Sequence, residues 1–139
     1  MASMIGSKVE RKEDKKFLTG KGRYTADINL HNQLHAVFIR SPHARAKIKG
    51  IDISKAKKAA GVVDVLTGKD MQDDKIGGLI AGWKIVSKDG TDMKCPAHPP
   101  LATDSVNYVG DHIALVVAET LQEAKDAADL VKVDYKVLK

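Results

Sequence analysis

Apolar and polar side chains alternate in several short segments, a pattern that predicts a domain built largely of strands. Residues 34–40 are apolar at both odd and even positions, which predicts a strand that is covered on both faces. Residues 44–49 alternate between apolar and basic side chains, and after Gly50 the apolar positions shift to Ile51 and Ile53. Because glycine tolerates a local break in a strand, this change of phase predicts a bulge or a sharp bend.

The next segment predicts a short helix followed by a strand. Ser54 is a suitable N-cap for a helix over residues 55–60, and Gly61 is the residue expected just after its last turn. Residues 62–66 are then predicted to form a strand. Within residues 67–70 a threonine and an aspartate stand three positions apart, which resembles a capping box and predicts one more helical turn.

The pattern is weakest between residues 71 and 100, where glycines and prolines are concentrated. This composition predicts a long loop with one strand near residues 79–86. Regular apolar positions return in residues 106–109 and 113–118, which are predicted to be strands. The short Gly-Asp segment between these two strands predicts a tight antiparallel turn.

The C-terminal segment predicts a helix and a last strand. Residues 120–123 read Thr-Leu-Gln-Glu, a capping box at a helix start. Behind it the apolar side chains recur at helical spacing: Leu121, Ala124, Ala127, Ala128 and Val131. Residues 131–137 alternate again, which predicts a half-buried strand. The order of these elements predicts an α+β fold with a mixed, largely antiparallel sheet and two main helices.

The composition agrees with one ordinary folded domain. The chain has 139 residues, of which 43% are hydrophobic and 29% charged, close to the usual values for globular proteins. Aromatic residues make up only 4% of the chain. Proteins that bind single-stranded nucleic acid stack bases on several aromatic side chains, so we predict no nucleic-acid partner.

The basic character of the chain is concentrated near its N-terminus. Of the formal net charge of +5, residues 1–25 carry +4 and the other 114 residues carry +1. We therefore predict an extended basic leader over residues 1–25 and one folded domain over residues 26–139. The leader mixes seven basic with three acidic side chains, which favours a solvated segment over an arm that binds phosphate or an acidic surface.

The sequence contains no recognisable catalytic or metal-binding constellation. Its five histidines lack zinc-ligand spacing, and the single Cys95 excludes an internal disulfide and a multi-cysteine site. The glycine-rich segment 20–24 has no flanking strand and helix of the kind that forms a phosphate loop. Ser41 and His43 are near neighbours, but no third group is placed to orient them. We predict no catalytic, cofactor-binding or metal-binding residue in this chain.

The sequence also predicts a cytoplasmic protein with no membrane partner. Four of residues 7–12 are charged where a signal peptide would be apolar. No segment approaches the run of about 18 apolar residues that a membrane-spanning helix needs. A lone cysteine suits a reducing compartment.

Four segments of the sequence resemble one family in both order and spacing. They are RKED at 11–14 with FLTGKGRYTADI at 17–28, LHAVFIRSPHA at 34–44, GVV at 61–63 with LTG at 66–68, and YVG at 108–110 continuing through IALVVAET at 113–120 to VDY at 133–135. Together they resemble the start of the large subunit of aerobic carbon monoxide dehydrogenases, aldehyde oxidases and xanthine dehydrogenases.

This resemblance implies the α/β hammerhead fold for the folded domain. It further implies a parent enzyme that oxidises carbon monoxide, an aldehyde or a purine-like substrate at a molybdenum–pterin centre. Electrons would leave through iron–sulfur clusters and FAD on partner subunits or domains. In this family the molybdenum-binding segments and the active-site glutamate lie much further along a longer chain. The isolated chain is therefore expected to bind no cofactor and to be non-catalytic.

A scaffold role follows from the same resemblance. The expected partners are the remaining domains of the large subunit and the iron–sulfur and FAD subunits. Six residues are the predicted interdomain contacts: Arg40, Ser41, Pro42, His43, Pro99 and Pro100. The alternative is a free-standing, non-enzymatic binding module that uses the basic leader as its contact arm.

Overall fold

A computed structural model of the chain describes residues 5, 6, 8, 10–80 and 82–138. These residues form two compact units, which divide between Gln33 and Leu34. We describe each unit by itself. The sequence predicted a boundary between residues 25 and 26, where the basic leader would end and the folded domain begin. That boundary stays a prediction.

The first unit contains two short helical elements. Helix α1 spans Asp14–Leu18, and a 3-10 turn, η1, spans Thr25–Asp27. The ring of Phe17 stacks on that of Tyr24, with centroids 5.1 Å apart. Local aromatic and capping contacts therefore give this segment some structure, although charge and composition alone favour extended chain.

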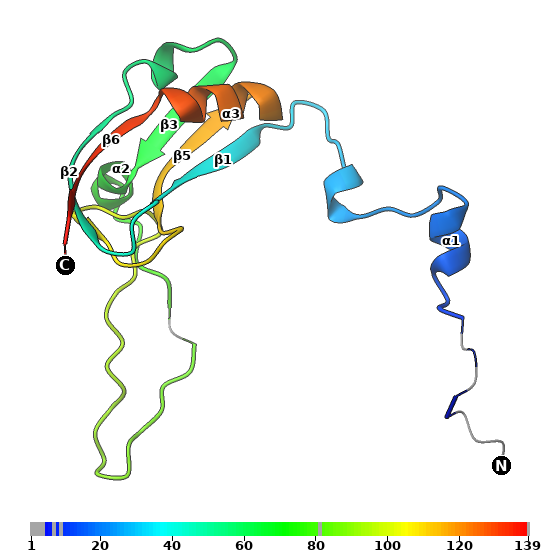
Figure 1. Cartoon of the computed structure of the whole chain (residues 1–139), viewed down its shortest axis with the longest axis horizontal. Helices are drawn as coiled ribbons and strands as arrows, with labels where there is room; N and C mark the ends of the chain where they lie inside the picture. The colour runs from blue at the N-terminus through cyan, green and yellow to red at the C-terminus, as the bar shows by residue number, and fades with distance from the viewer. Residues whose placement is uncertain (1–4, 7, 9, 81, 139) are drawn as a thin grey trace. The chain divides into compact units, whose positions relative to one another are not determined.

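The second unit contains two three-stranded sheets (Figure 1). In the first, sheet A, the order is β1 (His35–Arg40), β5 (His112–Ala118) and β3 (Val62–Thr67). In the second, sheet B, it is β4 (Ser105–Val106), β2 (Ala46–Asp52) and β6 (Lys132–Val137). All pairs between these strands are antiparallel. The predicted α+β class with a largely antiparallel arrangement is confirmed, with the strands divided between two sheets.

Helix α3 (Leu121–Leu130) covers one face of sheet A (Figure 1). The buried side chains between helix and sheet include Val65, Val116 and Ala127. The predicted capping box starts this helix, since the Thr120 hydroxyl accepts from the backbone N–H of Glu123 at 3.2 Å. Small alanines on the helix stripe allow it to lie close to the strands. The predicted helix and its cap are therefore confirmed.

A second buried cluster joins the two sheets. It contains Ala46 of β2, Val106 of β4, Ile113 of β5 and Ala102. Ile113 is fully buried, and it is the largest side chain among the most deeply buried residues. Because β5 is also the central strand of sheet A, this one strand contributes to both cores.

The predicted hairpin between residues 106–109 and 113–118 is wrong. Strand β4 pairs with β2, whereas β5 pairs with β1 and β3, so the chain crosses from one sheet to the other. The buried carboxylate of Asp111 explains the crossing, because it accepts from the backbone N–H of Asn107 at 3.0 Å and closes a local loop. Gly110 takes a φ of +92°, which glycine adopts without strain.

The predicted helix over residues 55–60 is shortened to a 3-10 turn, η2, at Ala56–Lys58. Ser54 is not its N-cap; the backbone N–H of Ser54 instead donates to the Asp52 carboxylate at 2.9 Å. A serine competes poorly with a preceding aspartate that can form an Asx turn. The bulge predicted at Gly50 is confirmed by a register shift between Ile48 and Gly50.

The capping carboxylate of α2 (Gly68–Asp73) makes the stability of this unit depend on pH. The Thr67 hydroxyl and backbone N–H each donate to Asp70 at 2.6 Å, and these bonds hold the pKa of Asp70 below its ordinary value. A carboxyl with a lowered folded-state pKa stabilises the fold above its unfolded-state pKa. That stabilisation is lost as the pH falls through the folded-state pKa.

We therefore expect Asp70→Asn to lower the free energy of unfolding by about 1 kcal/mol at neutral pH, the usual size of a capping effect. The difference from wild type should persist above the ordinary aspartate pKa of 3.8 and shrink as the pH falls below it. Urea unfolding at several pH values measures both quantities. A difference that is independent of pH would contradict this assignment.

The strand predicted near residues 79–86 is absent from the described residues of that segment. Only two isolated bridges occur there, between Leu79 and His98 and between Val86 and Asp92. We call residues 77–99 the arm, because they leave the sheets as two adjacent extended runs (Figure 1). Of the helices in the described part of the chain, none has the length and apolar character needed to cross a bilayer.

Candidate functional site

Helix α3 covers one face of sheet A, and the opposite face is also apolar. Successive side chains of a strand point to opposite faces, so the neighbours of the α3-facing residues lie on the other side. The register aligns Phe38, Leu115 and Leu66 in one row there. Phe38 keeps 42% of its surface exposed. We call this side of the sheet, with Ala36 and Val117, the open face.

The open face corrects the prediction that residues 34–40 are covered on both sides. Within this unit the strand alternates between half-buried and exposed positions, and Ala36 and Phe38 are exposed. Both parities of the strand are apolar, but among the described residues of this unit the second face is covered in part only, by α2 and the loop between α2 and β4. An apolar sheet face of this kind usually packs against another layer of structure.

A concavity of about 310 Å³ lies at one end of the open face. Its lining is apolar apart from one histidine ring. The lining residues come from β1, α2, β5 and the loop between α2 and β4: Phe38, Met71, Leu79, Pro100, Leu101, His112 and Leu115. The position of α2 depends on Gly68, where a Cβ would come within 2.5 Å of the Ala102 carbonyl oxygen.

Aromatic contacts organise the edge of the concavity. The Phe38 ring stacks on the His112 ring with centroids 4.3 Å apart, and the Arg40 guanidinium lies 6.0 Å from the Phe38 centroid. Arg40 also donates to the Gly110 carbonyl at 3.2 Å. The Nε2 atom of His112 is buried and has no hydrogen-bond partner among the described residues. A buried polar atom without a partner is unfavourable in a folded protein.

The predicted corner at residues 40–43 is held by backbone contacts. The N–H of Ser41 donates to the Asp111 carbonyl, and the N–H of Gly110 donates to the Ser41 carbonyl, both at 2.8 Å. The Ser41 hydroxyl accepts from the N–H of His43 at 3.0 Å. Ser41 is 2% exposed, so it offers almost no surface to a partner. Its role within this unit is to fix the corner.

The other predicted contact residues separate into two places. Arg40 and Pro100 border the concavity, because Pro100 lines it and Arg40 lies against Phe38. His43 belongs to the sheet B side, where its ring meets the Tyr135 ring edge-on at 4.9 Å. Pro42 and Pro99 are exposed. Sequence reasoning missed Phe38, Leu115 and Met71, although apolar residues on both parities of the strands were the available signal.

Two tyrosines near the site have raised pKa values. Burial and the neighbouring Asp111 carboxylate raise the pKa of Tyr108, whose hydroxyl lies 3.3 Å from His98 Nε2. Burial raises the pKa of Tyr135. Both shifts lead away from neutrality, so both hydroxyls stay protonated at pH 7 and neither is suited to act as a base.

The described residues do not offer the ligand groups of a metal centre. No three His, Cys, Asp or Glu side chains among them lie close enough to hold an ion, and Cys95 is an exposed residue of the arm. The concavity lacks the several polar donors that would hold a phosphate-bearing pterin. The lining of the concavity and the described His, Cys, Asp and Glu side chains therefore do not fit the molybdenum–pterin group. That the chain binds no cofactor stays a prediction.

Comparison with known families identifies the domain. The family model described as "Aldehyde oxidase and xanthine dehydrogenase, a/b hammerhead domain" matches residues 19–139. The chain therefore belongs to this family of hammerhead domains, as its sequence motifs predicted.

Individual relatives agree with the family match. The chain is 43% identical to the nicotine 6-hydroxylase large subunit of Paenarthrobacter nicotinovorans over 98% of its own length and 16% of the relative. It is 38% identical to the carbon monoxide dehydrogenase large chain of Afipia carboxidovorans over 96% of its length and 15% of the relative.

A solved structure confirms the fold. Quinoline 2-oxidoreductase from Pseudomonas putida 86 matches with a TM-score of 0.82 and 36% identity, over 96% of this chain and 16% of that chain. The hammerhead fold is thereby confirmed. The chain spans only about one sixth of the length of these relatives. They give no support to the alternative of a free-standing binding module.

Proposed function

We propose that this chain is the N-terminal scaffold domain of the large subunit of a molybdenum hydroxylase. The parent enzyme would oxidise carbon monoxide, an aldehyde or a purine-like nitrogen heterocycle at a molybdenum–pterin centre. That centre lies in other domains of the same subunit. Iron–sulfur clusters and FAD on partner subunits or domains receive the electrons, and the enzyme works in the cytoplasm.

The open face of sheet A is the observation that carries this proposal. A sheet with one face under α3 and an apolar second face supplies half of an interdomain core. Large exposed apolar patches mark interaction sites in soluble proteins. The relatives that match this chain are about six times as long, which supports further domains of the same chain as the cover of this face.

The interdomain contacts are assigned from this geometry. We place Phe38, Leu115 and Met71 at the centre of the contact, with Arg40 and Pro100 at its border. Pro42, His43 and Pro99 lie further out and would contact a partner only at the rim. Ser41 acts indirectly, because it holds the corner that carries Arg40.

Two measurements test the proposal. The complete reading frame should continue into cofactor-binding domains, and the full-length protein should purify with close to one molybdenum per chain, measured by inductively coupled plasma mass spectrometry. Residues 1–139 expressed under the same conditions should contain no stoichiometric molybdenum. A reading frame without cofactor domains, or one molybdenum per chain in residues 1–139, would reject the proposal.

A further inference from the structure

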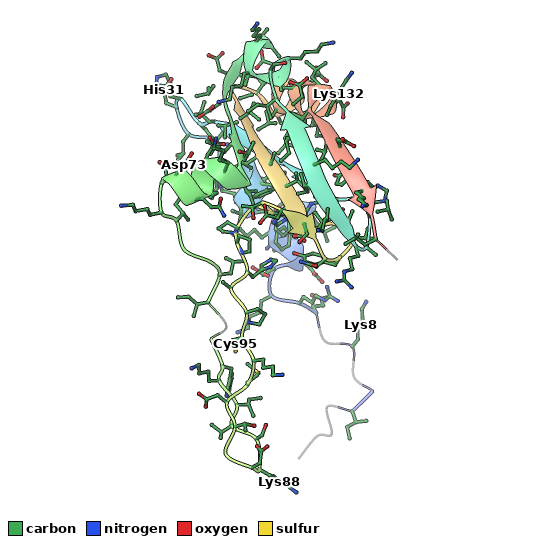
Figure 2. All side chains as sticks on the ribbon, turned by 90° about the vertical axis from the view of Figure 1, so that its left-hand side faces the viewer. Lys8, His31, Asp73, Lys88, Cys95 and Lys132 are labelled. Carbon is green, nitrogen blue, oxygen red and sulfur yellow. The ribbon has the colours of Figure 1, made fainter. Side chains whose placement is uncertain are left out.

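The arm, residues 77–99, is a second apolar surface of this unit, separate from the corner that the sequence singled out. All of its described residues are exposed. Lys88 lies at its tip and Cys95 part of the way back toward the sheets (Figure 2). Among its described residues, the two runs meet at two isolated bridges. A two-stranded segment of this kind has little stability of its own in water.

Few backbone hydrogen bonds hold the described part of the arm together. Leu79 N–H donates to the His98 carbonyl at 2.7 Å near the base, and Met93 N–H donates to the Ile85 carbonyl at 3.0 Å. A turn is closed by Ser87 N–H donating to the Thr91 carbonyl at 2.9 Å. Exposed amides with so few partners exchange rapidly with solvent unless a partner covers them.

The arm exposes large apolar side chains at adjoining positions. Ile80 is 93% exposed and Trp83 is 83% exposed, and Ile85 and Val86 are each more than half exposed. Tryptophan is enriched at the centres of protein interfaces, because it buries a large area with few rotatable bonds. Exposed apolar side chains on a segment with few hydrogen bonds are suited to packing against a partner rather than to contact with water.

We infer that the arm docks on the cofactor-binding domains of its own large subunit, with Trp83 as its central contact. This inference rests on the proposed function and names a second attachment point beyond the open face. The arm and the open face are continuous, because Leu79 belongs to the arm and also lines the concavity. A partner that covers the concavity is therefore already positioned to meet the arm.

The similarity to longer relatives favours a docking surface for the arm on the same polypeptide chain. The alignment with the nicotine 6-hydroxylase large subunit covers 98% of this chain, so it extends across the arm, while it takes up only 16% of the relative. A surface within the same chain meets the arm at a high effective concentration. The arm carries only a small net charge, from three lysines and two aspartates, and Lys84 lies 3.9 Å from Asp92. We therefore expect its apolar side chains to make most of the contact.

Hydrogen–deuterium exchange of the full-length large subunit tests this inference, with peptides of the arm and of β5 followed together. In the wild-type subunit the arm amides should exchange at least roughly tenfold more slowly than unprotected amides. Trp83→Ser should abolish this protection and leave that of β5 unchanged. The matched control, Lys88→Ser at the exposed tip, should leave both unchanged.

Each other outcome would overturn the inference. Free exchange of the arm in the assembled wild-type subunit would show that it does not dock. Protection that disappears when the subunit is diluted to a monomer would assign the arm to a second copy. Protection that requires the iron–sulfur or FAD subunit would assign it to that subunit. If the reading frame encodes cofactor domains, any of these results rejects the docking of the arm and leaves the proposed function standing.

Discussion

Replacing Ile113 by alanine should destabilise the second unit more than any other single truncation of an apolar side chain. Ile113 is fully buried where β5 meets Ala46 of β2, Val106 of β4 and Ala102. Removing three methyl or methylene groups there leaves a cavity between two sheets that cannot easily close. Truncations of this kind cost about 2–5 kcal/mol, a large fraction of the total stability of a domain.

Equilibrium urea unfolding, followed by circular dichroism, measures this loss. Ile113→Val should cost about 0.5–1.5 kcal/mol, because it removes one methylene group and leaves a smaller cavity. Val63→Ala is the control outside the core, because Val63 is 55% exposed, and it should change the stability by less than about 0.5 kcal/mol. A loss at Ile113 no greater than at Val63 would refute the role of this cluster in joining the sheets.

Replacing Phe38 by aspartate should sharply reduce the assembly of the full-length enzyme while the domain still folds. The domain itself should lose about 1–2 kcal/mol, because Phe38 is already 42% exposed and loses mainly its stacking on His112. In a covered interface the same carboxylate would be buried without a partner, which costs about 2–5 kcal/mol. The domain contact should weaken by at least about tenfold.

Leu130→Asp is the matched control for this variant. Leu130 is 40% exposed, close to the value for Phe38, but it lies on α3, which covers the opposite face of sheet A. The amount of monodisperse, molybdenum-loaded enzyme should fall for Phe38→Asp and stay near wild type for Leu130→Asp. An equal loss of molybdenum-loaded enzyme in the two variants would contradict the assignment of the open face as the interdomain contact.

The sequence predicted those parts of the fold that depend on local signals. The capping boxes at Thr67 and Thr120 and the bulge at Gly50 each need only a few neighbouring residues, and all three are present. The family motifs extended this to the hammerhead fold, which the structural match confirms. Local chemistry was therefore sufficient to predict these helix starts and the bulge, and several motifs in a fixed order were sufficient to predict the fold.

The sequence could not predict features that depend on distant partners. The segment around Gly110 has the composition of a hairpin turn, but the buried Asp111 closes a loop that sends β4 and β5 to different sheets. The concavity was missed for the same reason. Phe38 and Met71 are 33 positions apart in sequence, and only the positions of β1 and α2 bring them to one surface.

Turnover per bound molybdenum in the Phe38→Asp holoenzyme tests most directly whether this domain contributes packing rather than chemistry. The small fraction of enzyme that still assembles is purified, and its molybdenum content and its rate with the substrate of the parent enzyme are measured on one sample. A scaffold role predicts fewer loaded molecules, each with turnover within about twofold of wild type, because a purely structural domain makes no contact with the reacting atoms. Normal molybdenum content with a turnover reduced tenfold or more per metal would contradict the scaffold role.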